Sequence, residues 1–106
     1  TQERLVVLAL TNRNEVVGKA TVAVGAGNAC ILSPAEILRP VMLSGGHSFI
    51  MAHNHPSGEV DASEEDIILT RRMLDAGKLM GFELLDHVII GDRKHRSIID
   101  RAKGVL

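Results

Sequence analysis

The sequence is poor in aromatic residues and carries almost no net charge. Its 106 residues include two Phe and neither Trp nor Tyr, so it lacks the stacking platform on which many proteins bind single-stranded nucleic acid. The net charge of -1 provides no overall basic field to attract a phosphate backbone. Direct DNA binding by this chain is therefore not expected.

Cysteine and long apolar runs are also scarce. The single cysteine, Cys30, excludes an internal disulfide framework and a thiolate zinc cluster, and is typical of a reducing cytoplasm. It lies in an apolar stretch (29–32) without a neighbouring His, so we interpret it as a buried structural thiol. No apolar run approaches the ~18 residues that span a membrane, and no signal peptide is recognisable. We expect a cytoplasmic protein.

A hydrophobic content of 45% suits one globular domain over residues 1–106, large enough to bury about two-thirds of its unfolded surface. The chain begins at Thr1 without Met, which we interpret as a domain excised from a longer protein. Hydrophobic patterning predicts the order β-β-α-β-α-β and an α/β (α+β) layer sandwich, with a mixed sheet of about five strands and two main helices. The expected strands are 5–10, 16–24 with a bulge at Gly18, 48–52, 84–90 and a short 97–99.

The first helix is expected to begin at Ser33-Pro34-Ala35-Glu36, where an N-cap, an N1 proline and a capping-box Glu coincide. Pro40 is expected to kink or shorten it, and Gly45-Gly46 to end it. Its predicted apolar face is Ile37, Leu38, Val41 and Met42. The glycine-rich residues 25–28 are read as a loop rather than a phosphate cradle, because no Lys-Ser/Thr follows.

A second helix is expected from Ser63-Glu64-Glu65-Asp66 to about Met80, ended by Gly81. Asp66 heads its predicted core-facing stripe, which continues through Leu69, Met73, Ala76 or Gly77, and Met80. A carboxylate directed inward is costly unless it is paired or binds a metal. The tail from Asp100 is predicted to form a helical turn.

Potential catalytic chemistry is concentrated between His53 and Asp66. Side chains alternate along a strand, so His53 and His55 point to one side and can hold one ion. Asp66 supplies a third ligand, and three protein ligands leave a zinc position open for water, which favours a hydrolytic site. The alternative is that these residues form no metal site. The histidines would then be ordinary half-buried residues, and Asp66 would be an acid in the first helical turn, where the helix dipole favours it. Spacing alone does not decide between the two.

The letters His-Asn-His do not indicate an HNH nuclease, whose name describes residues spread over a ββα element. They belong instead to His53-Asn54-His55-Pro56-Ser57-Gly58, followed by Ser63-Glu64-Glu65-Asp66, with seven residues between His55 and Ser63. This pattern resembles the JAMM (MPN+/JAB) metalloprotease signature, and its Asn, Pro, Ser and Gly resemble the RadC-like branch. Residues 85–91 resemble a later strand of that branch, so the resemblance covers essentially the whole chain.

The resemblance implies a JAB/MPN-like fold of the cytidine-deaminase-like layer-sandwich class, and a Zn²⁺ ion held by His53, His55 and Asp66. It implies that Ser63 stabilises the tetrahedral oxyanion and that a Glu at the start of the first strand is the general base. Glu3 fits that place, whereas Glu15 lies in a turn and fits less well. The alternative for Glu3 is a solvated side chain at a strand end.

Some positions depart from the family pattern. Ala62 stands where the family usually has Pro, and Ala35 where an Arg is common. The upstream helix-hairpin-helix segment of the RadC branch, a DNA-binding element, is absent from this chain. Asp86 and His87 are interpreted as a structural hydrogen-bonded pair, and His47 and His95 as surface residues.

The favoured function is a zinc-dependent metallopeptidase or isopeptidase in a RadC-like, DNA-repair-associated protein, with a peptide or isopeptide as substrate. The alternative is a non-catalytic, metal-bound binding module in DNA repair or replication. A third hypothesis, a scaffold with a vestigial site, is disfavoured because the ligand set and Glu3 are all present. The sequence specifies neither the substrate nor the oligomeric state nor the preferred metal.

Overall fold

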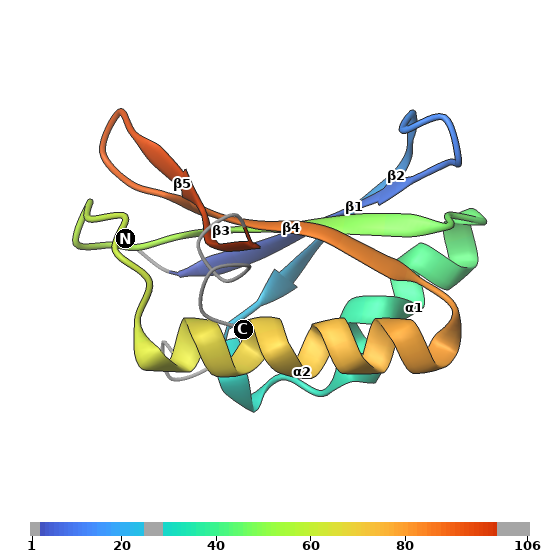
Figure 1. The fold of residues 1–106 in the computed structure, drawn as a ribbon. Coiled ribbons are helices and arrows are strands. Elements are labelled where there is room, and N and C mark those ends of the chain that lie inside the picture. The colour runs from blue at the N-terminus through green and yellow to red at the C-terminus, as the bar shows by residue number, and fades with distance from the viewer. Residues whose placement is uncertain (1–2, 25–28, 100–106) are drawn as a thin grey trace.

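The computed structural model describes residues 3–24 and 29–99, and confirms the predicted element order and mixed α+β class (Figure 1). A five-stranded sheet has the order β2-β1-β3-β4-β5, in which β3 and β4 are parallel and the other neighbours antiparallel. The strands are β1 (Arg4–Leu10), β2 (Val16–Ala23), β3 (Ser48–Asn54), β4 (Glu83–Ile90) and β5 (His95–Ser97). The helices are η2 (Ala29–Ile31, a 3₁₀ turn), α1 (Pro34–Ser44) and α2 (Glu64–Met80).

Both long helices lie on the same face of the sheet (Figure 1). Alternate residues of β1 and β3 point toward them, and Leu5, Val7, Phe49 and Met51 are at most 1% exposed. The apolar sides of the helices complete this core with Ile37, Leu38, Val41, Leu69 and Met73. The main core therefore lies between the sheet and the helices, and a smaller buried cluster consists of Val60, Ile89 and Ile98.

Helix α1 begins as predicted, with Ser33 and Glu36 forming a capping box, and ends at Gly45 in the left-handed conformation. Pro40 does not shorten it: the helix continues to Ser44 with one backbone donor fewer. Met42 was wrongly placed on the buried face, because it is 51% exposed. The buried stripe of α1 consists of Ile37, Leu38 and Val41.

Helix α2 begins after Ser63 and ends at Gly81, as predicted. Its buried stripe runs from Asp66 to Gly77, where the helix backbone packs closely against Phe82 and Phe49. The stripe does not reach Met80, which is 52% exposed, so that part of the prediction was wrong. At Gly77 a side chain would collide with the Phe82 carbonyl, and the close approach explains why glycine stands there.

The register of the sheet slips twice. Between Ala9 and Leu10 the extra residue is Val17, directly beside the predicted bulge position Gly18. Between Phe49 and Ile50 the extra residue is Leu85 on β4. The second slip matters for function, because it changes which face the following residues of β4 present.

The predicted last strand, 97–99, was misplaced. The strand is His95–Ser97, and the buried Ile98 and Ile99 that follow are already helical. Exposed His95 and His47 agree with their interpretation as surface residues. The expectations for the loop 25–28 and for the tail from Asp100 lie outside the described residues, and nothing is described of the Cys30 side chain.

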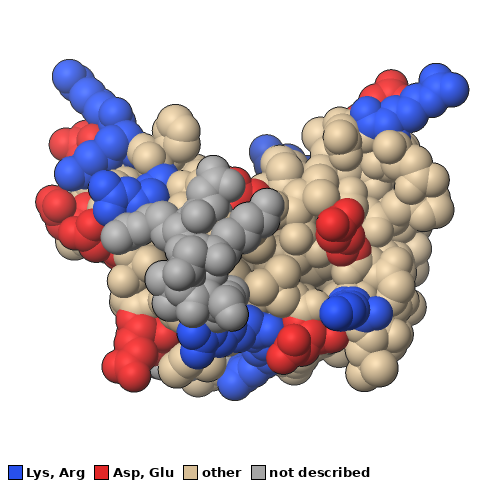
Figure 2. All heavy atoms as spheres, viewed as in Figure 1, with Lys and Arg blue, Asp and Glu red and all other residues tan. Residues whose placement is uncertain are grey.

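Charges of both signs alternate on the face shown in Figure 2, where Lys and Arg side chains stand beside Asp and Glu along its lower edge and at both upper loops. The described residues of this face therefore form no continuous basic surface. Among the described helices, none combines the length and the apolar character needed to cross a bilayer.

Candidate metal centre

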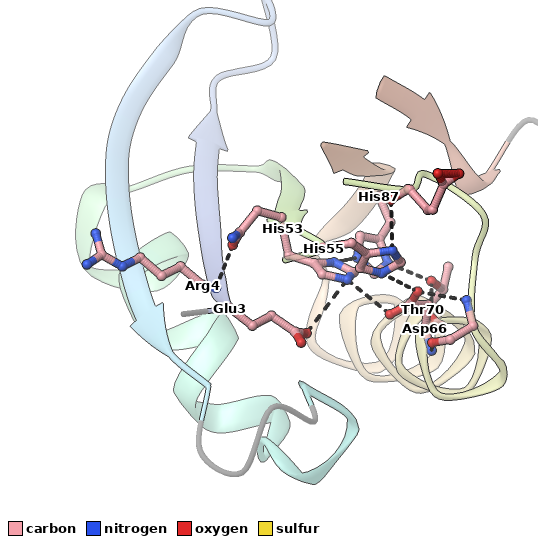
Figure 3. A network of polar contacts seen from close by, with 10 residues as sticks. Glu3, Arg4, His53, His55, Asp66, Thr70 and His87 are labelled. Carbon is pink, nitrogen blue, oxygen red and sulfur yellow. Dashed lines mark hydrogen bonds and ion pairs between the residues drawn. The ribbon is translucent and has the colours of Figure 1, made fainter. Parts of the chain in front are cut away.

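The end of β3 and the first turn of α2 bring His53, His55 and Asp66 together. His53 lies on the helix-covered face of β3, and His55 follows directly after the strand on the same side, as alternation predicts. Their ring centroids are 4.9 Å apart. One ligand atom from each of the three residues lies within 4.8 Å of the others (Figure 3). The predicted ligand set is thus assembled by the fold.

Asp66 is the third residue of α2 and belongs to its capping box. The Ser63 backbone N–H donates to Asp66 Oδ2 at 2.8 Å, and the Asp66 N–H donates to Ser63 Oγ at 3.1 Å. The carboxylate also faces both imidazoles, with Oδ1 3.0 Å from His53 Nε2 and Oδ2 2.9 Å from His55 Nε2. The capping interpretation and the ligand interpretation are therefore compatible, since the cap holds the carboxylate where a metal would need it.

The outer ring nitrogens show which atoms remain for a metal. His55 Nδ1 donates to the Glu59 carbonyl at 3.2 Å, which leaves the Nε2 lone pair of a neutral imidazole directed at Asp66. His53 Nε2 is buried and, despite its 3.0 Å contact with the carboxylate, has no hydrogen-bond partner in suitable geometry. In the neutral forms of the two imidazoles, two nitrogen lone pairs and a carboxylate converge on one point, which is a donor set that a cation would satisfy. The site fits a divalent metal of the zinc type.

Electrostatics favours the charged form of Asp66 and the neutral form of His87. Burial opposes ionisation of Asp66, but its contacts with His53 and its hydrogen bonds with Ser63 outweigh that penalty and hold its pKa well below the usual range. Burial, reinforced by the nearby His53, lowers the pKa of the His87 imidazole from 6.5 to about 3. At neutral pH, Asp66 is therefore a carboxylate and the His87 imidazole, which lies behind His53, is neutral.

Glu3 reaches the same place from the start of β1. Its Oε1 lies 3.9 Å from His53 Nε2, and its side chain is 13% exposed. The neighbouring Arg4 N–H donates to Asn54 Oδ1 at 2.7 Å, a bond that fixes the start of β1 against the end of β3. Glu15 lies in the turn at the opposite end of β1, so the structure places Glu3 and not Glu15 beside the His-His-Asp group.

Sequence reasoning missed His87 and Thr70. His87 was expected to pair with Asp86, but only its backbone N–H does so, at 2.7 Å. Its side chain is fully buried beneath His53, with Nε2 2.7 Å from His53 Nδ1 and Nδ1 2.7 Å from Thr70 Oγ1 (Figure 3). The available signal was weak: a polar His and a polar Thr, each within an otherwise apolar buried pattern.

A cleft of about 400 Å³ opens onto this group. It is lined by Glu3, Ala29, His55, Pro56, Ser57, Ser63, Glu65 and Asp66. A larger groove of about 870 Å³ lies between the end of α2 and the start of β4. The described residues that line the larger groove include no His-His-Asp group, so we assign the chemistry to the smaller cleft.

The fold and the His-His-Asp centre define a JAB-type domain, and comparisons with known proteins specify the branch. Residues 1–105 match the family model of the RadC-like JAB domain, and the chain belongs to that family. It is 45% identical over 106 residues to the UPF0758 protein YsxA of Bacillus subtilis, covering 100% of this chain and 45% of that protein. It is 39% identical over 99 residues to a UPF0758 protein of Methanosarcina acetivorans, covering 93% of this chain and 43% of that protein. The chain therefore spans slightly less than half the length of these curated relatives.

Proposed function

We propose that this chain is a zinc-dependent hydrolase domain that cleaves peptide or isopeptide bonds. The observation that carries the proposal is the convergence of His53 Nε2, His55 Nε2 and the Asp66 carboxylate next to Glu3, at the base of an open cleft. Membership in the RadC-like JAB family supports the same reaction class.

His53, His55 and Asp66 would hold the ion, and two nitrogens with one oxygen form a donor set that suits zinc. A zinc ion there supplies Lewis acidity, which polarises a carbonyl and lowers the pKa of water to about 7. Three protein ligands are typical of catalytic rather than structural zinc sites, which have four. The donor set thus favours hydrolysis over a purely structural role.

Glu3 is suited to move the proton. As water adds to the substrate carbonyl carbon, the Glu3 carboxylate accepts its proton and later gives it to the leaving amine as the C–N bond breaks. Ser63 Oγ accepts a hydrogen bond from the Asp66 N–H, so its own O–H can donate to a substrate oxygen in the cleft. That donation would stabilise the oxyanion.

The experiment compares Glu3→Gln with Asp66→Ala, measuring zinc content and cleavage of fluorogenic peptides and of lysine-ε-linked isopeptides. Glu3→Gln should retain zinc and lose hydrolysis by at least about 100-fold, the usual contribution of a general base. Asp66→Ala should lose both. The hydrogen bond from the Arg4 N–H to Asn54 Oδ1 does not involve the Glu3 side chain, so Glu3→Gln should leave the start of β1 in place.

Equal hydrolysis by wild type and Glu3→Gln would contradict the mechanism. Zinc binding without cleavage of either substrate class, in this chain and in a full-length relative, would instead favour the metal-bound binding module. Salt-dependent binding of duplex DNA by the full-length relative alone would place any DNA contact outside this chain.

A further inference from the structure

His53 rests on a buried chain of hydrogen bonds that ends on the backbone of its fellow ligand Asp66. From His53 the chain passes to His87 and then to Thr70, each step being 2.7 Å. Thr70 Oγ1 then contacts the Asp66 main-chain carbonyl, also at 2.7 Å. The three side chains are at most 1% exposed, so no bulk water competes for these bonds.

The position of every proton in this chain follows from its last bond. A carbonyl only accepts, so the Thr70 hydroxyl donates its single proton to Asp66 O. Thr70 Oγ1 must then accept from His87 Nδ1–H. His87 is fully buried and neutral, so with Nδ1 protonated its Nε2 is an acceptor. His53 Nδ1 must therefore carry the hydrogen. In the neutral imidazole His53 Nε2 is then left bare, in agreement with its lack of a hydrogen-bond partner.

A bare Nε2 is not the arrangement that Asp66 alone would select. The carboxylate Oδ1 lies 3.0 Å from His53 Nε2 and would attract a proton onto that nitrogen. A proton there would occupy the atom that a metal needs. The hydrogen-bond chain works against this attraction, and it explains why His53 Nε2 is buried without a partner.

We infer that Thr70 and His87 are positioning residues that fix the Nδ1–H tautomer of His53 and thereby keep Nε2 available for the metal. The inference rests on the metal site proposed above and deepens it. Outer partners of this kind commonly change metal affinity by about 10- to 100-fold. Here the partner is a second imidazole, oriented in turn by a helix hydroxyl.

Removing the Thr70 hydroxyl should reverse the direction of the hydrogen bond between His87 and His53. In Thr70→Val, His87 Nδ1 loses its acceptor, so its proton is better placed on Nε2, where it donates to His53 Nδ1. His53 then carries its hydrogen on Nε2 and donates to Asp66 Oδ1. Zinc must displace that proton, which weakens binding.

The test uses the tautomer of His53 in zinc-free protein, read from imidazole ¹⁵N chemical shifts, together with zinc affinity from chelator competition. Wild type should show the Nδ1–H form, and Thr70→Val the Nε2–H form with about 10- to 100-fold weaker zinc binding. Thr70→Ser, which keeps the hydroxyl, should restore both. Ser44→Ala removes a hydroxyl that also donates to a helix carbonyl, Val41 O, but lies on α1 away from the site, and should change neither.

An unchanged His53 tautomer in Thr70→Val, with wild-type zinc affinity, would overturn the inference. An affinity loss shared equally by Thr70→Val and Thr70→Ser would also overturn it, because packing and not the hydroxyl would then be responsible. Failure of wild type to bind zinc would contradict the proposed function. The tautomer comparison, made without metal, would still decide whether Thr70 and His87 orient His53.

Discussion

The two histidines of the metal centre are held by different kinds of structure: His53 by buried side chains and His55 by the backbone of an exposed loop. His53 stands on the buried relay, defined as His53, His87 and Thr70, whose side chains are at most 1% exposed. His55 begins the site loop, residues 55–62, and its outer nitrogen is held by the Glu59 backbone carbonyl. Exposed ion pairs connect that loop to β5 and the turn before it, at Lys94–Glu59 and Arg96–Asp61.

The difference shows two ways of orienting a ligand. In the relay, orientation depends on the identity of two further side chains packed between sheet and helix. In the loop, it depends on backbone shape, since any residue at position 59 offers the same carbonyl. Exposed ion pairs contribute little, about 0–1 kcal/mol each, so backbone hydrogen bonds and turn geometry hold the loop. Substitutions should therefore affect the two regions differently.

The largest contrast is expected between His53→Ala and His55→Ala in zinc-free protein. His53→Ala opens a cavity and leaves the buried His87 Nε2 without its donor, so it should lower the free energy of unfolding by about 2–4 kcal/mol. His55 is part-exposed, with a side chain 15% accessible, and its loss should cost about 1 kcal/mol or less. Urea unfolding measures both values.

Zinc binding provides the control for that pair, because both variants remove a ligand and both should lose the ion. Equal stability losses in the two variants would show that the relay is no more important to the fold than the loop. The contrast drawn between the two regions would then be wrong.

The next effect is expected at Gly58 in the site loop. Gly58 has φ +83°, and an added Cβ would lie 3.2 Å from the Asp92 Cβ, so Gly58→Ala should cost about 1–2 kcal/mol. The Gly58 N–H donates to the His55 carbonyl at 2.9 Å, so backbone strain at position 58 should also displace His55 and weaken zinc binding. Unfolding and chelator competition measure the two effects.

Gly45→Ala is the matched control, because Gly45 has a similar φ of +76° with nothing within 4 Å of an added Cβ. It should lose stability from backbone strain alone and keep wild-type zinc affinity. If Gly58→Ala also left zinc affinity unchanged, loop geometry would not control His55.

The smallest effect is a pH dependence conferred by His87 in the relay. Because the folded pKa of His87 is about 3 and its ordinary value is 6.5, the unfolded chain binds more protons between these values. The stability of zinc-free protein should thus fall as the pH is lowered through that window, by about 1 kcal/mol or less between pH 6.5 and 5.5.

The lowered pKa of Asp66 also makes stability fall with pH, but only below its ordinary value of 3.8. It therefore does not contribute between pH 6.5 and 5.5. His87→Gln should flatten the stability profile between pH 6.5 and 5.5 relative to wild type. A parallel profile in that variant would show that His87 is not buried in its neutral form.

The helix ends and the residues of the candidate site could be predicted from the sequence, because the signals that mark them are local. Ser33, with its capping-box Glu36, and Ser63 marked both helix starts, and Gly45 and Gly81 marked their ends. The His-x-His alternation and the inward-facing first-turn Asp66 made a common site possible, and the resemblance to the JAMM signature favoured the grouping that the structure shows. The helix ends depend on neighbours within one turn, so local sequence is enough to find them.

The relay could not be found in that way. Regular alternation from Leu84 would put Asp86, not His87, on the helix-covered face, and only the register slip at Leu85 brings His87 under His53. Met42 and Met80 were misplaced for a related reason: apolar residues at helix ends continue the pattern after the neighbouring layer has ended. Long-range register and the edge of the core are not encoded within a single element.

The most direct test of the central claim is the zinc content of protein purified without chelator, measured by elemental mass spectrometry beside Asp66→Ala. About one zinc per chain in wild type, lost in Asp66→Ala, is the predicted result, because the His-His-Asp group forms a single three-ligand site. No zinc in wild type, even after supplementation, would contradict the account.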